Sequence, residues 1–218
     1  MGTKYNPKKV TNGLVLYVDA ANSRSYSGSG LTSFGLINNL NGTLVNGVGF
    51  TTTNNGYFTF DGTNDYLNFG NSSSVRLLNG TISAWVRATS PGSGFRGIFA
   101  KQYAYGLFYN ESILVAYDWG ASATRSTSLN IADGNWKNVV MTFQSAVSNG
   151  TKIYLNGSLV LTTTITWVND TQNLFGGAEA SAGQYAACFG SMFSLYNRVL
   201  TDQEVLQNYN STKKRYGL

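Results

Sequence analysis

The chain has 218 residues, of which 42% are hydrophobic, 14% aromatic and only 11% charged. This length fits one large β-sandwich domain, and the composition is that of a globular protein whose polar surface consists mainly of Asn, Thr, Ser and Gly. Histidine is absent and Cys188 is the sole cysteine. These two facts exclude a Ser-His-Asp triad, a disulfide within the chain and a histidine-containing zinc site.

The net charge of +5 comes from the two ends of the chain. Six of the 15 basic residues lie there, which leaves nine basic residues against 10 acidic ones. These six are Lys4, Lys8, Lys9, Lys213, Lys214 and Arg215. The body is nearly neutral, so we expect no nucleic-acid groove.

No stretch approaches the roughly 18 apolar residues of a membrane span, and the first residues lack the apolar run of a secretory signal. We therefore expect neither membrane insertion nor signal-directed export.

Short alternating runs, separated by clusters of Gly, Asn and Ser, predict an all-β sandwich or barrel. In chain order we expect strands at 14–18, 57–60, 66–69, 81–88, 97–101, 105–110, 112–118, 125–129, 136–144, 152–155, 158–162 and 187–196. Residues 22–35 are expected to form a Ser/Gly-rich loop. Asn-Gly pairs predict turns at residues 41–42, 46–47, 149–150 and 156–157.

The strand at 81–88 has the clearest pattern, because Ile82, Ala84 and Val86 alternate with polar or larger residues. The end of the chain carries a helix signal instead. Thr201 and Glu204 have the spacing of a capping box, and the flanking residues 200 and 205 fit a hydrophobic staple. A short helix is therefore expected from this box through about residue 209. We expect a basic N-terminal arm at 1–12, a single sandwich domain at 13–210 and a basic C-terminal tail at 211–218.

Several segments carry a family resemblance by their order and spacing. They are GLVLYVDAANSRSY at Gly13, NGTLVNG at Asn41, FTFDGTNDYLNFG at Phe58, TISAWVRA at Thr81, DGNWKNVVMTF at Asp133, KIYLNGSLV at Lys152 and LYNRVLTDQEVLQNYNSTKKRYGL at Leu195. Together they resemble the laminin G-like, concanavalin A-like jelly-roll domains of phage structural proteins and bacterial surface proteins. The resemblance implies a single two-sheet jelly roll with one short C-terminal helix.

The last of these segments is similar to the C-termini of tailed-phage virion proteins that carry this domain. The similarity implies a location in the virion, which assembles in the host cytoplasm and leaves by lysis. Such a location would explain a surface-type composition without an export signal. Members of the family include lectins, glucanases, adhesion modules and shell decorations, so the fold alone does not select a function.

Enzymatic activity is not expected. Glycoside hydrolysis needs two carboxyl groups that face each other across a cleft. The glutamates are Glu111, Glu179 and Glu204, and neither Glu111 nor Glu179 has an acidic residue two positions away as jelly-roll glucanases do. Glu204 is already explained by the helix cap. The sequence therefore predicts a protein that binds rather than catalyses.

Two candidate binding sites follow from the residue types. Asp61, Asn64 and Asp65 place three oxygen-bearing side chains in one short Gly-containing loop, and hard oxygen ligands suit calcium. Any calcium there would be structural, and the alternative is that the loop side chains make turn hydrogen bonds. A second group shares one strand parity and could form an aromatic platform for sugar rings, or pack beneath covering segments. Its members are Trp85, Trp136, Tyr154 and Tyr196.

The segment at 103–109 holds more aromatic residues than the core face of one strand requires. They are Tyr103, Tyr105, Phe108 and Tyr109. Aromatic residues are enriched at protein interfaces. The alternative is a hairpin that is half-buried in the sandwich.

The leading hypothesis is a non-catalytic virion surface protein, either a capsid decoration or a fibre-associated accessory protein. It would stabilise the particle or adhere to host glycans, with capsid or other virion proteins as partners. The six terminal basic residues would form one attachment patch, because domain termini often lie close together. A homo-oligomer is an expectation of the class. A carbohydrate-binding lectin module is the alternative function, and a glucanase-type glycosidase is the third.

Overall fold

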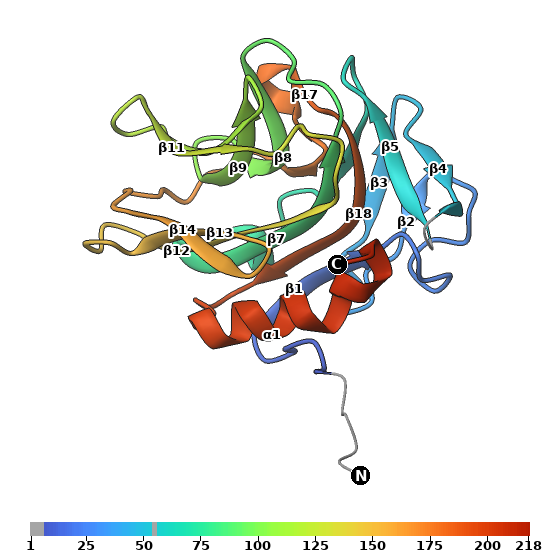
Figure 1. Cartoon of the computed structure of the whole chain (residues 1–218), viewed down its shortest axis with the longest axis horizontal. Helices are drawn as coiled ribbons and strands as arrows, with labels where there is room; N and C mark the ends of the chain where they lie inside the picture. The colour runs from blue at the N-terminus through green and yellow to red at the C-terminus, as the bar shows by residue number, and fades with distance from the viewer. Residues whose placement is uncertain (1–6, 54–55) are drawn as a thin grey trace.

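A computed structural model describes residues 7–53 and 56–218. Within these residues the chain forms two eight-stranded antiparallel sheets that pack face to face, a two-stranded hairpin and one α-helix (Figure 1). This arrangement confirms the predicted all-β jelly-roll sandwich with a short C-terminal helix.

The first sheet has the strand order β14-β13-β12-β7-β18-β5-β4, and β1 pairs with the second half of β18. The strands are β1 (Leu14–Asp19), β4 (Gly49–Thr51), β5 (Tyr57–Asp61), β7 (Asn79–Ala88), β12 (Lys137–Gln144), β13 (Thr151–Leu155), β14 (Ser158–Thr163) and β18 (Ala187–Tyr196). Strands β7 and β18 lie at its centre. The sheet thus joins segments from both halves of the chain.

The second sheet has the order β11-β10-β9-β8-β15-β6-β3-β2. Its strands are β2 (Thr32–Ser33), β3 (Gly42–Val45), β6 (Tyr66–Asn68), β8 (Phe95–Lys101), β9 (Tyr105–Asn110), β10 (Ile113–Asp118), β11 (Ala123–Asn130) and β15 (Leu174–Gly176). A small hairpin of β16 (Ala178–Glu179) and β17 (Gln184–Tyr185) follows β15, with the 3-10 turn Ala180–Ala182 between its strands. This hairpin packs against β8.

The core lies between the sheets and follows the alternation of the sequence. The inward residues of β7 and β12 are all at most 2% exposed, namely Ile82, Ala84, Val86, Val139, Met141 and Phe143. In β18 the register shifts between Gly190 and Met192. Phe193 and Leu195 therefore belong to the core, whereas Phe189 packs with Tyr57 on the outer face. Burial of these apolar side chains is the main driving force for folding.

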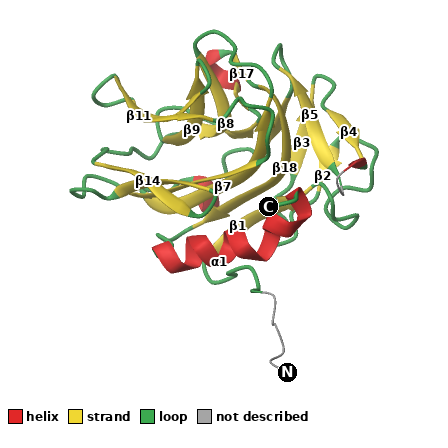
Figure 2. Ribbon diagram, viewed as in Figure 1, coloured by secondary structure: helices red, strands yellow, loops and turns green. Residues whose placement is uncertain are grey.

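Helix α1 (Asp202–Thr212) lies along the outer face of the first sheet (Figure 2). It begins at the predicted capping box, in which the Thr201 hydroxyl accepts from the Glu204 N–H (3.2 Å) and the Glu204 carboxylate accepts from the Thr201 N–H (2.9 Å). Arg198 also donates two hydrogen bonds to this carboxylate, at 2.6 and 2.8 Å. The pKa of Glu204 is lowered to about 2, mainly because the Arg198 guanidinium donates these hydrogen bonds. Two further 3-10 turns are Ser73–Val75 and Lys213–Tyr216.

Two of the local predictions need correction. Asn46-Gly47 and Asn156-Gly157 have positive φ at both residues, as two-residue hairpin turns require. Gly42, in contrast, begins β3 and pairs with Ser33, so the predicted turn at 41–42 is wrong. Glycine is needed there because a Cβ would lie 2.7 Å from the Phe69 ring. The expected loop at 22–35 contains the short strand β2.

The described parts of the two basic ends, residues 7–12 and 211–218, pack against the sandwich. Helix α1 continues to Thr212, and the following turn is fixed by an ion pair between Arg215 and Asp19 at 2.7 Å. At the other end, the Val10 N–H donates to Asn208 of α1 (2.8 Å). Within the described residues, the chain on both sides of the expected boundaries at 12 and 211 contacts the rest of the domain. No helix in the described part of the chain is long and apolar enough to cross a membrane.

Candidate functional site

The expected glycan platform is buried beneath the C-terminal segment. All four residues of the platform are at most 7% exposed, namely Trp85, Trp136, Tyr154 and Tyr196. Trp85 stacks on Tyr216 with ring centroids 4.0 Å apart, and its indole N–H donates to the Thr212 hydroxyl (3.0 Å). The Tyr154 hydroxyl donates to Asp202 (2.7 Å). The prediction of a sugar-stacking surface at these rings is wrong, because their shared face is the one that packs against α1 and the terminal turn.

The Asp61–Asp65 loop has the turn geometry that was the alternative to calcium. The Asp61 carboxylate accepts from the backbone N–H groups of Thr63 (2.7 Å) and Asn64 (3.3 Å), which lowers its pKa. Asn64 contributes its backbone carbonyl, which accepts from the Asn46 amide (3.0 Å). Asp65 is buried, and its Oδ1 has no hydrogen-bond partner among the described residues. Burial and, secondly, the nearby Asp61 charge raise the pKa of Asp65.

The described residues contain no group of three or more His, Cys, Asp or Glu side chains placed to hold a metal. Asp61, Asn64 and Asp65 include only two carboxyl groups, so the calcium site remains a prediction. Among the buried side-chain oxygens of this loop that the structure describes, Oδ1 of Asp65 is the one that accepts no hydrogen bond.

The predicted attachment residues divide into two groups. Lys4 lies outside the described residues. Arg215 pairs with buried Asp19, and Lys9 lies 4.7 Å from the ring centre of Tyr17, where burial lowers its pKa to about 8. These two cations are engaged within the domain.

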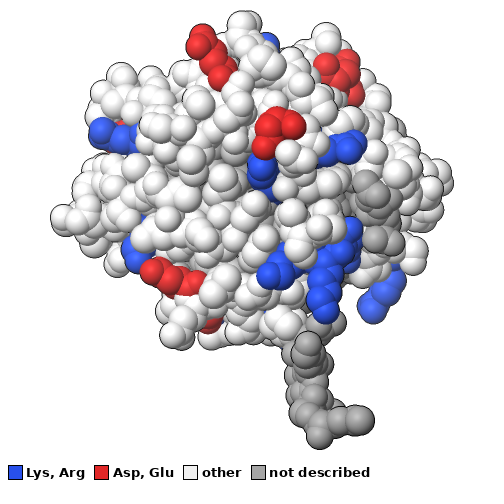
Figure 3. All heavy atoms as spheres, in the orientation of Figure 1, with Lys and Arg blue, Asp and Glu red and all other residues white. Residues whose placement is uncertain are grey.

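Three lysines remain near the end of the folded chain. Lys8 and Lys214 are exposed, and Lys213 is half-buried with its ammonium 5.2 Å from the ring centre of Tyr209. The two ends are neighbours, as expected, since Gln207 of α1 donates to the Lys8 carbonyl (2.8 Å). Figure 3 shows several basic side chains gathered in the lower right of this face, while acidic and other basic side chains are scattered over the rest of it. We call these three residues the lysine patch.

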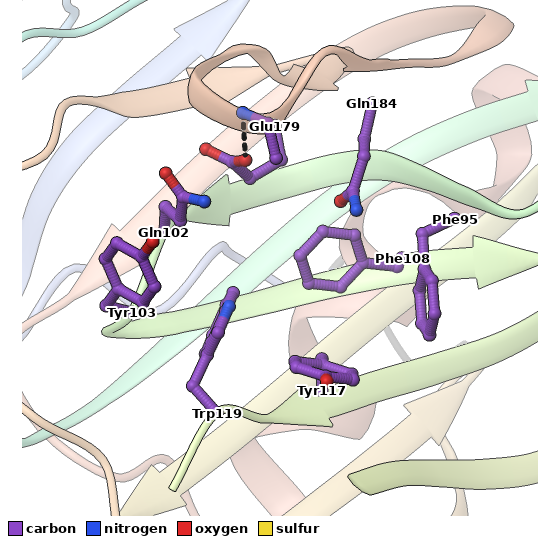
Figure 4. Close-up of a pocket in the computed structure, with 9 residues that line it drawn as sticks. Phe95, Gln102, Tyr103, Phe108, Tyr117, Trp119, Glu179 and Gln184 are labelled. Carbon is purple, nitrogen blue, oxygen red and sulfur yellow. Dashed lines mark hydrogen bonds between the residues drawn. The ribbon is translucent and has the colours of Figure 1, made fainter. Parts of the chain in front are cut away.

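A pocket of about 280 Å³ opens on the outer face of the second sheet, between strands β8 to β10 and the β16–β17 hairpin (Figure 4). We call it the aromatic pocket. It is lined by Phe95, Gln102, Tyr103, Phe108, Tyr117, Trp119, Glu179, Ala182 and Gln184. Strand alternation explains its wall, because Leu107 and Tyr109 of β9 belong to the core while Phe108 between them faces outward.

The rings of the pocket contact one another at steep angles. Trp119 is the central ring, with centroid distances of 5.6 Å to Tyr117, 6.0 Å to Phe108 and 6.5 Å to Tyr103. Phe95 extends the wall, 5.3 Å from Tyr117. Edge-to-face pairs of this kind stabilise a fixed arrangement of rings. Tyr103 stands at the rim and is 49% exposed.

The opposite side of the pocket is polar. Glu179 and Gln184 come from the small hairpin, and Gln102 comes from the turn between β8 and β9 (Figure 4). Glu179 is only 1% exposed, and its carboxylate accepts from the N–H groups of Ser181 (3.3 Å) and Ala182 (2.8 Å). Burial raises the pKa of Glu179.

Gly97 of β8 allows the hairpin to approach, because a Cβ at this position would overlap the backbone of Ala178 and Glu179. The fully buried Lys101 anchors the same region from the other side of β8. Its ammonium donates to Asn71 (2.8 Å) and to the Gln172 carbonyl. The Gln172 side chain in turn accepts from the Ser181 hydroxyl (3.2 Å). Burial lowers the pKa of Lys101 to about 8.

The aromatic segment at 103–109 therefore serves both purposes that the sequence left open. Tyr105 and Tyr109 lie in the core, whereas Tyr103 and Phe108 line the pocket. Sequence reasoning missed the rest of the lining. The alternation of Tyr117 and Trp119 around Asp118 could have indicated a second aromatic face next to Phe108.

Residues 61–206 match the model of the Concanavalin A-like lectin/glucanases superfamily, Laminin_G_3. The match covers more than half of the chain, and the chain belongs to this superfamily. No curated protein is significantly similar to it in sequence.

Two solved structures illustrate the similarity in fold. A Trypanosoma rangeli sialidase in complex with sialic acid superposes with a TM-score of 0.71 and 15% identity, covering 93% of this chain and 33% of the sialidase. The binding domain of Paraclostridial Mosquitocidal Protein 1 gives a TM-score of 0.71 and 16% identity, covering 91% of this chain and 52% of that chain. Our chain thus spans 33% to 52% of the length of these proteins, and the likeness concerns the fold alone.

Proposed function

We propose that the chain is a non-catalytic carbohydrate-binding module and that the aromatic pocket is its sugar site. The observation that carries this proposal is the pairing of an aromatic wall with convergent polar groups. Small-molecule sites are concave and largely aromatic, with a few polar groups that fix orientation. The C–H face of a sugar ring can stack on the half-buried ring of Trp119, beneath which Phe108 is buried, while the amides of Gln102 and Gln184 bond its hydroxyl groups. The superfamily to which the chain belongs is named for lectins as well as glucanases.

The pocket chemistry favours binding over hydrolysis. Among the described residues of its lining, Glu179 carries the only carboxyl group. Glycosidases of the usual kind need a second carboxyl group roughly 5–9.5 Å away as nucleophile or base. Glu111 and Glu204 do not line this pocket. We therefore expect no turnover of laminarin, agar or lichenan.

A glycan array tests the sugar site. The wild-type chain should bind selected glycans, and Trp119→Ala should weaken that binding by about tenfold, since stacking on an aromatic ring contributes about 0.5–1.5 kcal/mol beyond the area that it buries. Phe34→Ala is the matched control, because Phe34 is an aromatic residue 52% exposed and outside the pocket. The proposal fails if the wild type binds no glycan, or if both variants bind as well as the wild type.

We also propose that the module works on a phage virion surface, as a capsid decoration or a fibre-associated protein that adheres to host glycans or stabilises the particle. The similarity of the segment beginning at Leu195 to phage virion C-termini supports this location. The lysine patch supports attachment to an acidic surface of capsid or other virion proteins, since facing charges steer docking. Arg215 and Lys9 are left out because they are engaged within the domain.

Retention on purified particles tests the attachment. Replacing Lys8, Lys213 and Lys214 with Ser should leave the melting temperature nearly unchanged and weaken retention, more so as salt is raised. An antibody to the chain should label particles in negative-stain images. Unlabelled particles would remove the virion location, and equal retention across a salt series would move the attachment to another surface.

A further inference from the structure

The aromatic pocket contains a buried negative charge without a cationic partner. Two other buried carboxylates of the domain are paired, Asp19 with Arg215 and Asp118 with Arg125, each at 2.7 Å, whereas buried Asp65 forms no salt bridge among the described residues. Within residues 7–53 and 56–218, no Lys or Arg side chain forms a salt bridge with Glu179. Glu179 therefore differs from the paired carboxylates in being open to compensation by a ligand.

The local structure fixes this carboxyl group and offsets part of the effect of burial, which raises the pKa of Glu179. Two backbone N–H groups donate to its oxygens, which favours the ionised form against the effect of burial. The neighbouring cation on β8, Arg96, donates instead to the Tyr185 carbonyl (3.2 Å). The other titratable groups that line the pocket are the hydroxyls of Tyr103 and Tyr117. A buried charge with no counter-ion is costly, and a cation in the pocket would offset that cost.

The wall across the pocket also favours positive charge. Aromatic faces attract cations electrostatically, and several rings arranged around one space attract them most. Glu179 and four aromatic rings line the same pocket. Each ring contacts Trp119 or another ring of the group, which consists of Phe95, Tyr103, Phe108 and Tyr117. The carboxylate on one side of the pocket and the aromatic rings on the other thus both attract a positively charged ligand.

We propose that the aromatic pocket selects amino sugars with a free ammonium group over their neutral counterparts and rejects sugars that carry a carboxylate. This selectivity rests on the proposed sugar-binding function. The ammonium group lies between the carboxylate of Glu179 and the ring faces, and the sugar C–H face stacks on Trp119. A uronic or sialic acid brings a second negative charge into a site of low dielectric constant, where like charges repel strongly.

An array of matched oligosaccharides tests the proposal. It carries gluco-, galacto- and manno-configured sugars, each in an amine, a neutral and a carboxylate form. At neutral pH the wild-type chain should bind an amine form about tenfold or more tightly than its neutral form, as expected for a hydrogen bond to a charged group. Binding to the carboxylate forms should be undetectable. Glu179→Gln should reduce the difference between amine and neutral forms to less than about twofold, whereas Glu111→Gln, at an exposed turn, should preserve it.

The outcomes separate the two proposals. Binding of no sugar would refute both the sugar site and the selectivity. Equal binding of amine, neutral and carboxylate forms, lost in Trp119→Ala, would leave the sugar site intact and overturn the selectivity. A preference for amines that Glu179→Gln does not change would assign it to other residues and also overturn the proposal.

Acidification provides a measurement that needs no variant. As pH falls, Glu179 becomes protonated and loses its charge, while an amino sugar becomes more fully charged. Affinity for the amine forms should therefore fall between about pH 7 and pH 4. If affinity rises or stays constant over this range, the carboxylate of Glu179 is not the selecting group.

Discussion

Replacing Tyr216 with Ala should destabilise the domain, because this ring covers the tryptophans on the outer face of the first sheet. Tyr216 stacks on Trp85 at 4.0 Å and contacts Trp136 at 4.9 Å. Two aromatic pairs contribute about 1–3 kcal/mol beyond the burial of area. Loss of burial of this half-buried side chain adds ~1 kcal/mol. The free energy of unfolding should thus fall by about 2–4 kcal/mol, which lowers the melting temperature by roughly 5–15 °C for a domain of this size.

Chemical denaturation followed by tryptophan fluorescence measures this change. Lys214→Ala is the control, because the neighbouring Lys214 side chain is exposed and lies in the same turn. A second reading comes from the glycan array, where uncovering Trp85 should add no new binding. Unchanged stability together with a gain of glycan binding in Tyr216→Ala would refute the interpretation that Trp85 and Trp136 are packing residues.

Three further predictions concern single positions. Gly97→Ala should lower the free energy of unfolding by about 1–3 kcal/mol and weaken sugar binding, because the added methyl group displaces the hairpin that carries Glu179. Gly120→Ala is the control and should change stability little, because a methyl group at that position meets only ordinary contacts. Millimolar calcium should raise the melting temperature relative to EDTA, and Asp65→Asn should abolish the difference; equal melting temperatures would remove the calcium site. The pKa of Glu204 is lowered to about 2, so its stabilising effect is present above the ordinary glutamate pKa and disappears as pH falls from about 4.5 to about 2. The loss should be about 1–2 kcal/mol after allowance for solvent screening, and a Glu204→Gln variant that shows the same decline would contradict it.

Periodicity allowed most of the fold to be predicted. The alternation at residues 81–88 placed Ile82, Ala84 and Val86 on one face, and these residues lie in the core. The capping box at Thr201 and Glu204 marked where the helix begins, because both partners are three residues apart in sequence. Such signals depend on neighbouring residues, so they are visible without knowledge of tertiary structure.

The role of the outer aromatic residues could not be predicted in this way. Parity correctly placed Trp85 away from the core, but a period of two does not reveal which segment covers a face. Tyr216 reaches Trp85 across 131 positions of sequence because the last turn is fixed by the pair between Arg215 and Asp19. Arg215, one of the basic residues that suggested a free tail, thus anchors the C-terminal turn to the domain.

The aromatic pocket could be predicted only in part from the sequence, because it also depends on contacts between distant segments. Strands β16 and β17 have two residues each, which is too short for a recognisable alternation. Glu179 enters the pocket because Gly97, far away in sequence, leaves room for the hairpin backbone. The excess of aromatic residues at 103–109 was the local signal of the site, and Tyr103 and Phe108 are the members that reach it.

The two outer faces of the sandwich therefore have different chemistry. On the first sheet, α1 and the terminal turn cover the aromatic rings, and the lysine patch surrounds the end of the chain. On the second sheet, Tyr103 is exposed and Trp119 and Tyr117 are half-buried, and these rings line the same pocket as Glu179. Figure 1 shows α1 and the β16–β17 hairpin at opposite ends of the molecule, with both sheets between them. A module that docks through the lysine patch on an acidic surface would present the aromatic pocket away from that surface, where a glycan on another surface can enter it.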